Sequence, residues 1–246
     1  MPISVVIIAK DEADRIRPCI AAATEVSDDI VVLDSGSTDD TVNIARAAGA
    51  TVVQVDWLGY GATKNLGHTY AKHDWILSLD ADEVLSDQLI SSLHEVIPTR
   101  GTVYLLDRMV KMQDQYIRHS GWHPDWVYRL YHKEDCKWDS ALVHEKLVLP
   151  AGYTTSRLVG VLTHYSFRSI DHFRAKTDQY ARLAASQWLA TGRQPSIAKQ
   201  LMGPWWKYVQ TYYLYRGFLD GKLGKVIAQT LADGVRKKIQ YYKELA

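Results

Sequence analysis

Two carboxylates in one short motif are the strongest chemical signal in the sequence. Asp80 and Asp82 belong to a D-A-D-E string that follows the apolar run 75–79 directly. Carboxylates at positions i and i+2 after a strand can both turn toward one hard cation. Mg²⁺ or Mn²⁺ prefers such oxygen ligands and commonly keeps substrate phosphates in its shell. The same string also suits a solvated acidic turn ahead of a helix over 86–97, so the motif alone leaves two interpretations open.

Other polar side chains stand after further apolar runs. Asp34 opens a D-S-G-S-T-D-D string, in which Gly36 fits a turn into a helix. Its carboxylate can accept from a ribose hydroxyl or a base N–H, and a helix N-terminus favours negative charge. Asp11 and Glu12 follow the first apolar run in the same way, and Lys64 lies where it can reach a phosphate. Each of these also fits an ordinary capped turn, a helix start or a solvated lysine.

Strands and helices alternate along the first hundred residues, and this alternation positions the polar residues. It predicts an α/β fold with a doubly wound sheet that binds its ligand at the carboxyl ends of the strands. Beyond about residue 100 a mixed sheet is expected, followed by helices. The expected strands are 3–9, 30–34, 51–55, 75–79, 102–108, 126–132 and 143–149, and the early helices are 13–24, 41–48 and 61–72.

The domain division follows from this pattern. We expect one domain over 1–168, with a first half at 1–100 and a second half at 101–168. A helical, basic and aromatic extension is expected over 169–246.

Composition excludes several classes of protein. The 246 residues are 47% hydrophobic and 23% charged, as in globular proteins, which excludes long disorder and low-complexity architecture. No apolar run reaches the roughly 18–20 residues of a membrane span, and the N-terminus does not read as a secretory signal. Cys19 and Cys136 are expected to be reduced thiols in a cytosolic protein. A formal net charge of +1 gives no general argument for nucleic-acid binding.

The C-terminal segment is unlike the rest of the chain. Residues 199–246 hold 9 Lys+Arg against 3 Asp+Glu. Amphipathic helices of this kind can lie in an anionic membrane interface, with Trp and Tyr at headgroup depth. They can equally pack on the preceding domain or on a second copy of the chain. The aromatic residues are Trp205, Trp206, Tyr208, Tyr212, Tyr213, Tyr215, Tyr241 and Tyr242.

The order of these strings resembles a known family. A-K-D-E, V-V-L-D-S-G-S-T-D-D-T, K-N-L-G and W-I-L-S-L-D-A-D-E together resemble the nucleotide-sugar-binding half of family 2 glycosyltransferases, which have the GT-A fold. The resemblance runs from Ile3 to about Tyr165. It implies a nucleotide-sugar-binding half at 1–100 and an acceptor-binding half at 101–168. It is closer to the lipopolysaccharide-core heptose glucosyltransferase group. That group also pairs a W-x-G-[YF]-G-x-x-K-N element, here Trp57 to Asn65, with later R-L-[YF] and V-H-E strings.

The resemblance implies a donor site. In the family, a carboxylate after the first strand (here Asp11 or Glu12) and the D-S-G aspartate (Asp34) hold the nucleoside. The D-x-D carboxylates hold a divalent cation, Mg²⁺ or Mn²⁺, with Asp82 the more direct ligand. Many relatives have Asn-Glu where this chain has Lys10-Asp11-Glu12, so the family pattern does not assign the base contact of this strand. The implied nucleotide-sugar-binding residues are Ala9, Asp11, Glu12, Asp34, Ser35, Gly36, Lys64, Asp80, Ala81 and Arg129, and the implied metal-binding residues are Asp82, Asp80 and His164.

The family also takes a general base from beyond the D-x-D motif. Glu145 is the candidate, with Asp125 and Asp139 in reserve, although a strand-edge glutamate facing water fits the same string. Burial beside an aromatic side chain is expected to raise the pKa of the Glu145 carboxyl. Arg129 and His164 also suit structural roles. Half of the aromatic residues in the loop at 122–126 suit core packing. The expected acceptor-binding residues are Trp122, His123, Trp126 and His144.

These observations predict a metal-dependent, inverting glycosyltransferase. It would move a hexose, with UDP-glucose as the first donor to try, onto a sugar of the lipid-linked lipopolysaccharide inner core. It would be cytoplasmic and peripheral at the inner membrane, with an anionic membrane surface and a second copy of the chain as further partners and no nucleic acid. A polyprenyl-phosphate glycosyltransferase and a non-catalytic nucleotide-sugar- or lipid-binding module are the alternatives.

Overall fold

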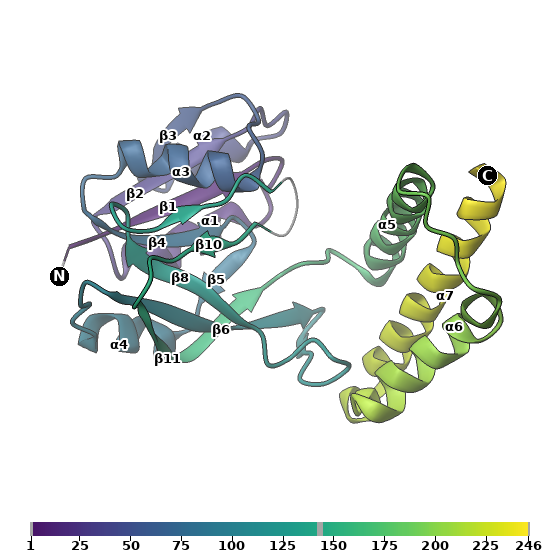
Figure 1. Cartoon of the computed structure of the whole chain (residues 1–246). Helices are drawn as coiled ribbons and strands as arrows, with labels where there is room; N and C mark the ends of the chain where they lie inside the picture. Colours follow the sequence, from purple (N-terminus) through teal and green to yellow (C-terminus); the bar gives the residue numbers. More distant parts are fainter. Residues whose placement is uncertain (1, 142–144, 246) are drawn as a thin grey trace. The chain divides into compact units, whose positions relative to one another are not determined.

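The computed structural model describes residues 2–141 and 145–245 of the chain, which form two compact units. The sheet unit comprises Met1–Arg108 and Asp125–His164, and the helical unit comprises Met109–Pro124 and Tyr165–Ala246. Each unit is therefore built from two stretches of the chain (Figure 1).

The sheet unit is built on a mixed sheet. Its strand order is β3-β2-β1-β4-β8-β6-β11-β5, in which β1 to β4 are parallel and β8 is antiparallel to both β4 and β6. The register pairs Ala9 with Asp34 and Ile8 with Asp80, so the ends of β1, β2 and β4 share one edge. The strands are β1 (Ile3–Ala9), β2 (Asp29–Asp34), β3 (Thr51–Gln54), β4 (Trp75–Asp80), β5 (Glu83–Leu85), β6 (Thr102–Met112), β8 (Trp126–His132) and β11 (Thr154–His164).

Buried strands and amphipathic helices explain this architecture. Every residue of β1 and β2 is buried, as expected for strands covered by helices on both faces. The helix α1 buries Ile16, Cys19 and Ile20 in one of the two cores of this unit. The helices are α1 (Ile16–Thr24), α2 (Thr41–Ala47), α3 (Tyr60–Tyr70) and α4 (Asp87–Glu95), and a small second sheet pairs β9 (Lys137–Trp138) with β10 (Leu147–Val148).

The α/β fold expected from the sequence, a mixed sheet with flanking helices followed by a helical extension, is confirmed. Strand β11 and the short β5 are not among the expected strands, because their sequences lack a clean alternation of apolar and polar residues. Of the expected strand 143–149, the described part contains β10, and residues 142–144 lie outside the described residues.

The helical unit has a core of its own. Three helices, α5 (Ile170–Ala190), α6 (Ile197–Val209) and α7 (Gly221–Leu245), follow the sheet unit in the sequence. A π-helical turn (Gln210–Leu214) and a 3-10 turn (Gly217–Asp220) connect the last two. The core combines Met112 and Ile117 with Phe173, Leu223 and Ile227. Trp122 packs against it, in ring contact with Phe167 and Phe173.

A buried carboxylate fastens the segment 109–124 within this unit. Asp220, only 2% exposed, accepts hydrogen bonds from the backbone N–H of Arg118 and His119 and from the Ser120 hydroxyl. The sequence pattern places 109–124 in the first domain, whereas these contacts attach it to the C-terminal helices. The predicted domain boundaries themselves stay a prediction.

Within the described part of the chain, we find no helix whose length and apolar character would let it cross a membrane.

A glycine allows α3 to lie close to the sheet. A Cβ atom placed on Gly67 would stand 2.3 Å from Val6 Cγ1 and 3.1 Å from Leu33 Cδ2. Both distances are shorter than ordinary packing contacts. Gly67 therefore determines how closely α3 approaches β1 and β2.

We expect Gly67→Ala to destabilise the protein by about 1–3 kcal/mol, because overpacking costs more than the roughly 1 kcal/mol that alanine gains in a helix. Urea unfolding of Gly67→Ala, Val6→Ala and the double variant measures the effect. Val6→Ala removes the clashing methyl groups, so the double variant should be at least 1 kcal/mol more stable than the sum of the single changes predicts. Simple additivity would show that the close approach does not limit stability.

Candidate active site

A buried ammonium group joins residues that lie far apart in the sequence. Lys64, on α3, is 1% exposed, and its Nζ lies 2.8 Å from Glu145 Oε1 and 3.2 Å from Asp80 Oδ1. Its charge also stands 4.5 Å from the centre of the Trp138 ring. Burying a lysine is costly unless its charge is balanced. The two carboxylates and the indole supply that balance, and they bring the end of β4 together with Glu145.

Arg129 contacts the second carboxylate oxygen of Asp80. Its Nη2 donates to Asp80 Oδ2 at 2.8 Å and also to Glu83, which is completely buried. Glu83 accepts the backbone N–H of Asp80 as well, at 3.1 Å. Burial by itself would raise the pKa of the Asp80 carboxyl. The charges of Lys64 and Arg129 outweigh it and lower that pKa well below the ordinary value.

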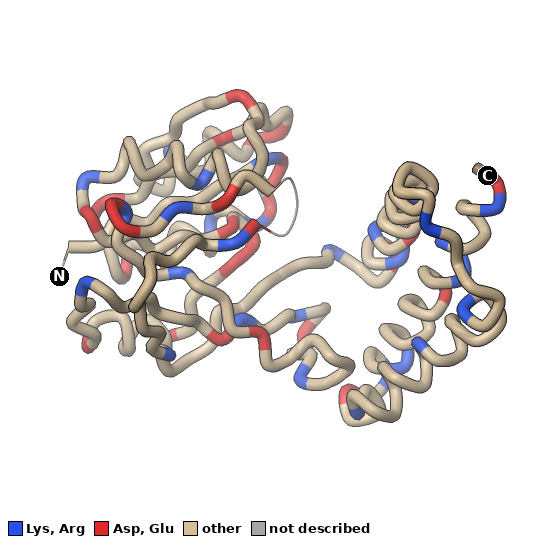
Figure 2. Tube along the Cα trace, viewed as in Figure 1, with Lys and Arg blue, Asp and Glu red and all other residues tan. Residues whose placement is uncertain are grey.

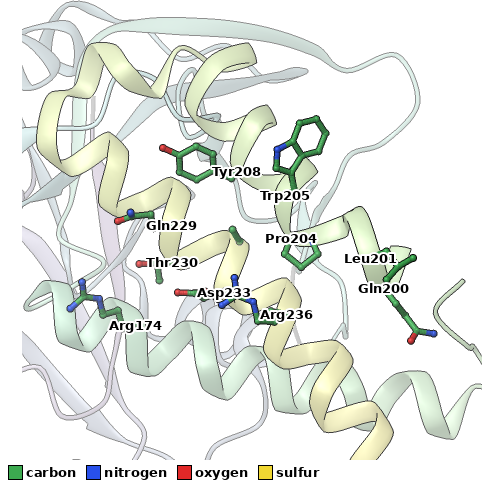
Figure 3. Close-up of a pocket in the computed structure, with 11 residues that line it drawn as sticks. Arg174, Gln200, Leu201, Pro204, Trp205, Tyr208, Gln229, Thr230, Asp233 and Arg236 are labelled. Atoms are coloured by element: carbon green, nitrogen blue, oxygen red, sulfur yellow. Dashed lines mark hydrogen bonds and ion pairs between the residues drawn. The ribbon is translucent and has the colours of Figure 1, made fainter. Parts of the chain in front are cut away.

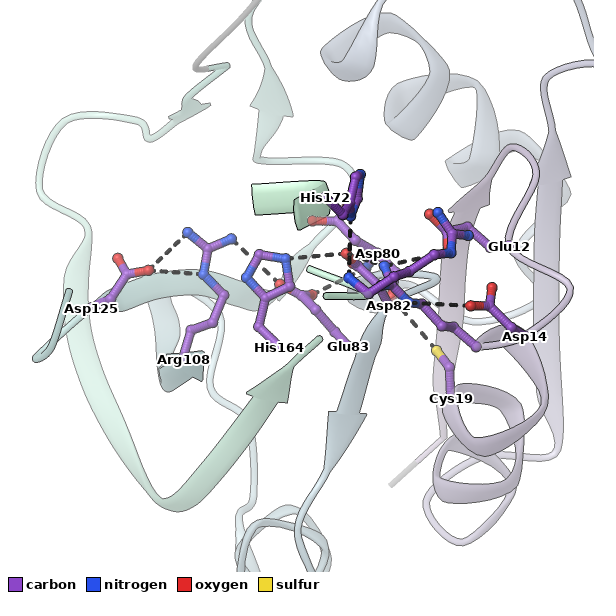
Figure 4. A network of polar contacts seen from close by, with 12 residues as sticks. Glu12, Asp14, Cys19, Asp80, Asp82, Glu83, Arg108, Asp125, His164 and His172 are labelled. Carbon is purple, nitrogen blue, oxygen red and sulfur yellow. Dashed lines mark hydrogen bonds and ion pairs between the residues drawn. The ribbon is translucent and has the colours of Figure 1, made fainter. Parts of the chain in front are cut away.

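Asp82 has a different neighbour. Its Oδ2 lies 3.3 Å from His164 Nε2, at the end of β11, and 3.8 Å from Arg15 Nη1 (Figure 4). Burial raises the pKa of the Asp82 carboxyl, but the hydrogen bond and charge of His164 lower it overall. The side chains of Asp82 and His164 are 18% and 19% exposed, so a ligand can reach both.

These donors suit a hard divalent cation. Asp82 and His164 face each other, and Asp80 Oδ1 contacts Lys64 only as an ion pair, without hydrogen-bond geometry. Within residues 2–141 and 145–245, however, no group of three or more His, Cys, Asp or Glu side chains is arranged to hold a metal ion.

The turn after β2 is linked to the turn after β1. Asp34 is fully buried and accepts the backbone N–H groups of Gly36 and Ser37. Asp11, with a left-handed φ of 54°, accepts from the Thr38 N–H at 2.7 Å. No atom would meet a Cβ on Gly36 within 4 Å, so the backbone there is open to close approach by a ligand. The remaining implied donor residues surround this edge, with Ala9 and Ser35 joined by a backbone hydrogen bond and Ala81 bonded to Ile8.

The two reserve candidates for the base have structural partners. Asp125 accepts a hydrogen bond from Arg108 Nε at 2.8 Å, and Arg108 Nη1 also lies 3.5 Å from Glu83 Oε1 (Figure 4). Asp139 accepts the backbone N–H groups of Ala141 and Lys146. Glu145 instead pairs with Lys64, which also contacts Asp80, so it is the one of the three that shares a cation with Asp80.

The described acceptor residues among those predicted are divided between the two units. Trp126 belongs to the sheet unit, where the Arg157 guanidinium stacks 4.5 Å from the centre of its ring. Trp122 and His123 belong to the helical unit, and His144 lies outside the described residues. The acceptor-binding role of these residues stays a prediction.

The comparisons with known proteins identify the family. Residues 4–153, more than half of the 246-residue chain, match the family described as glycosyl transferase family 2. The chain belongs to this family. It is therefore a glycosyltransferase with a GT-A fold, as the resemblance implies.

Several relatives have similar lengths. An uncharacterised glycosyltransferase of Rickettsia bellii is 30% identical, over 99% of this chain and 87% of the relative. The lipopolysaccharide core biosynthesis glycosyltransferase LpsC of Rhizobium meliloti is 27% identical, over 93% and 89%. Among solved structures, glucosyl-3-phosphoglycerate synthase of Mycobacterium tuberculosis, crystallised with Mn²⁺ and UDP-glucose, is 28% identical with a TM-score of 0.36, over 45% of this chain and 44% of that one.

Three residues of this family 2 site escaped the sequence reasoning. Neither Arg15 nor Arg108 was singled out in the sequence, and Glu83 enters only as the last residue of the D-A-D-E string. The available signal was an unusual excess of carboxylates around β4, which requires cations to balance it. No sequence spacing indicates which arginines supply them.

We expect Lys64→Met to lower the free energy of unfolding by about 3 kcal/mol, because removing one partner of a buried pair leaves the other charges uncompensated. Because the pKa of Asp80 is lowered in the folded state, this carboxylate adds stability above its ordinary pKa of about 4, and that stability is lost as the pH falls. Lys64→Met should therefore lose less stability than the unchanged protein as the pH falls from 7 to 3. Urea unfolding between pH 3 and pH 7 measures both effects.

Lys146→Met is the matched control, because Lys146 is exposed and directly follows Glu145. It should change stability by no more than about 0.5 kcal/mol. Equal effects of the two substitutions would contradict a supporting role for Lys64.

Proposed function

We propose that this family 2 enzyme is a metal-dependent, inverting glycosyltransferase that moves a hexose, glucose from UDP-glucose, onto a sugar of the lipopolysaccharide inner core. The observation that carries the proposal is the contact of Lys64 with both Asp80 and Glu145. It brings the motif expected to bind the donor within reach of the carboxylate expected to act on the acceptor.

The donor would lie along the edge formed by the ends of β1, β2 and β4. Asp34 shapes the turn there, and Gly36 leaves room above it. Asp11 or Glu12 would contact the nucleoside beside them. Lys64 and Arg129 would balance the negative charge of the diphosphate, since both already face Asp80.

Asp82, assisted by Asp80 and His164, would hold the divalent cation. Mg²⁺ is commonly bound through one or two carboxylates together with substrate phosphates, so few protein ligands suffice. When bound, such an ion supplies Lewis-acid stabilisation of the negative charge on the leaving nucleoside diphosphate.

Glu145 would act as the general base. Its carboxylate would take the proton of the acceptor hydroxyl while that oxygen bonds to the anomeric carbon, and the nucleoside diphosphate would leave with the electron pair of the broken bond. The ammonium of Lys64, 2.8 Å from Glu145 Oε1, orients the carboxylate.

The similarity to LpsC supports a lipopolysaccharide-core acceptor, and the basic, aromatic helical unit supports attachment to the cytoplasmic face of the inner membrane. In the alternative with a polyprenyl-phosphate acceptor, the attacking phosphate would need no strong base. The role of Glu145 therefore separates the two acceptors.

We expect Glu145→Gln to reduce transfer to a core oligosaccharide at least 100-fold, because the amide cannot accept the proton, and general bases contribute about 10²–10⁴-fold. The thermal shift given by UDP-glucose with Mn²⁺ should be unchanged. Released UDP is the readout of turnover, measured with a panel of UDP-, GDP- and ADP-sugars, with Mn²⁺, Mg²⁺ or EDTA. Asp82→Asn should abolish the metal-dependent part of donor binding.

Glu134→Gln, at an exposed position of the same unit, is the control and should retain full activity. Full activity of Glu145→Gln on a polyprenyl phosphate would favour that acceptor. If no nucleotide sugar shifts the melting curve with any metal, the donor site is assigned wrongly and a binding module becomes the better hypothesis.

A further inference from the structure

A groove of about 810 Å³ runs between α5, α6 and α7 within the helical unit (Figure 3). Its lining includes Arg174 from α5, Leu201 and Trp205 from α6, and Thr230 and Arg236 from α7. None of the residues assigned to the glycosyltransferase site lines it. A cavity of this volume can hold a ligand the size of a lipid headgroup.

Two arginines, Arg174 and Arg236, and one carboxylate, Asp233, line the groove and leave it a net positive charge. Arg174 Nη1 lies 3.1 Å from Asp171 Oδ1, and Arg236 Nη1 lies 2.8 Å from Asp233 Oδ1. Each guanidinium has five N–H donors in a fixed plane, so a single ion pair orients it without using all of them. Arginines presented in this way are suited to phosphate groups.

The rim of the groove on α6 is apolar. Leu201 and Trp205 are 77% and 58% exposed although they line the groove. None of the residues of α6 is buried, even though the helix packs against α7. Ile197, Met202 and Trp206 extend the exposed apolar surface along the same helix.

A second group of cations lies at the start of α6. The ammonium groups of Lys199 and Lys238 stand 4.7 Å and 3.6 Å from the centre of the same Trp188 ring. Burial, followed by the positive charges of Lys199 and Arg193, lowers the pKa of Lys238. These cations repel one another, so an anion bound among them would relieve the repulsion.

The whole helical unit carries the same sign of charge. It contains 16 Lys+Arg against 6 Asp+Glu, while the sheet unit contains 13 against 22. Figure 2 shows Lys and Arg along α5, α6 and α7. An exposed apolar helix flanked by cations is typical of a segment that lies in the interface of an anionic membrane.

We propose that the groove between α5, α6 and α7 binds the phosphate headgroup of an anionic membrane lipid. Arg174 and Arg236 contact the phosphate, while Leu201 and Trp205 enter the apolar region beside it. Asp233 keeps Arg236 directed over the groove. The inference rests on the membrane attachment included in the proposed function and assigns that attachment to one site.

The test is flotation of the full-length protein with vesicles of phosphatidylcholine alone, or with about 30% phosphatidylglycerol. We expect binding only to the anionic vesicles. Arg174→Gln combined with Arg236→Gln should weaken it at least tenfold more than Lys222→Gln combined with Lys225→Gln. The control removes the same charge from exposed lysines of α7 in the same unit. Leu201→Ser should weaken binding even at high salt, where long-range attraction is screened.

Equal losses of vesicle binding in the two double variants would contradict a lipid site in the groove, because they would show that electrostatic attraction to the membrane is spread over the whole unit. Glycerol phosphate as a soluble competitor distinguishes a site for free phosphate compounds, which it would saturate, from one that needs a lipid. Thermal shift with UDP-glucose and Mn²⁺ is measured on the same samples. Donor binding without vesicle binding contradicts only this inference, and vesicle binding without donor binding contradicts only the proposed donor site.

Discussion

The geometry of the site depends on one buried positive charge. Lys64 stands between Asp80 and Glu145 and against the face of Trp138. Without its ammonium group, two carboxylates from distant parts of the chain would be held together at a high electrostatic cost. The cost of burying the lysine is offset only while both carboxylates stay in place beside it. The lysine therefore fixes the end of β4 and the position of Glu145 together.

Arg129 and Glu83 extend the same balance of charge. Glu83 has no exposed surface, and its carboxylate accepts hydrogen bonds from Arg129 and from the backbone N–H of Asp80. This second layer holds Asp80 from behind, while Asp82 remains partly open beside His164. The two aspartates of one short motif thus have different surroundings. One is fixed by cations of the protein, and the other is accessible to a ligand.

The sequence predicts the positions of Asp11, Asp34, Asp80 and Asp82 well, because each follows a continuous apolar strand and parallel strands end at a common edge. It does not predict the meeting of Lys64 with Glu145. That contact requires the β9–β10 hairpin to lie against α3, and Gly61 permits this because a Cβ there would stand 2.0 Å from the carbonyl oxygen of Asp139. Trp122 shows the same limit. Its sequence context suits both a sugar platform and core packing, and only the structure shows that its ring contacts Phe167 and Phe173. Contacts of this kind depend on how separate elements pack, which local patterns do not encode.

The path of the chain determines where this protein can be divided without breaking a hydrophobic core. The chain leaves the sheet unit after Arg108, returns at Asp125 and leaves again after His164. Met112 and Ile117 lie in the first excursion, but their apolar partners Phe173, Leu223 and Ile227 lie in the second. A gene truncated after β11 would therefore encode an intact sheet with an orphaned loop, whose apolar side chains and Asp220-bound amides would face water. The helical unit therefore has its complete core only when the loop that precedes β8 is present.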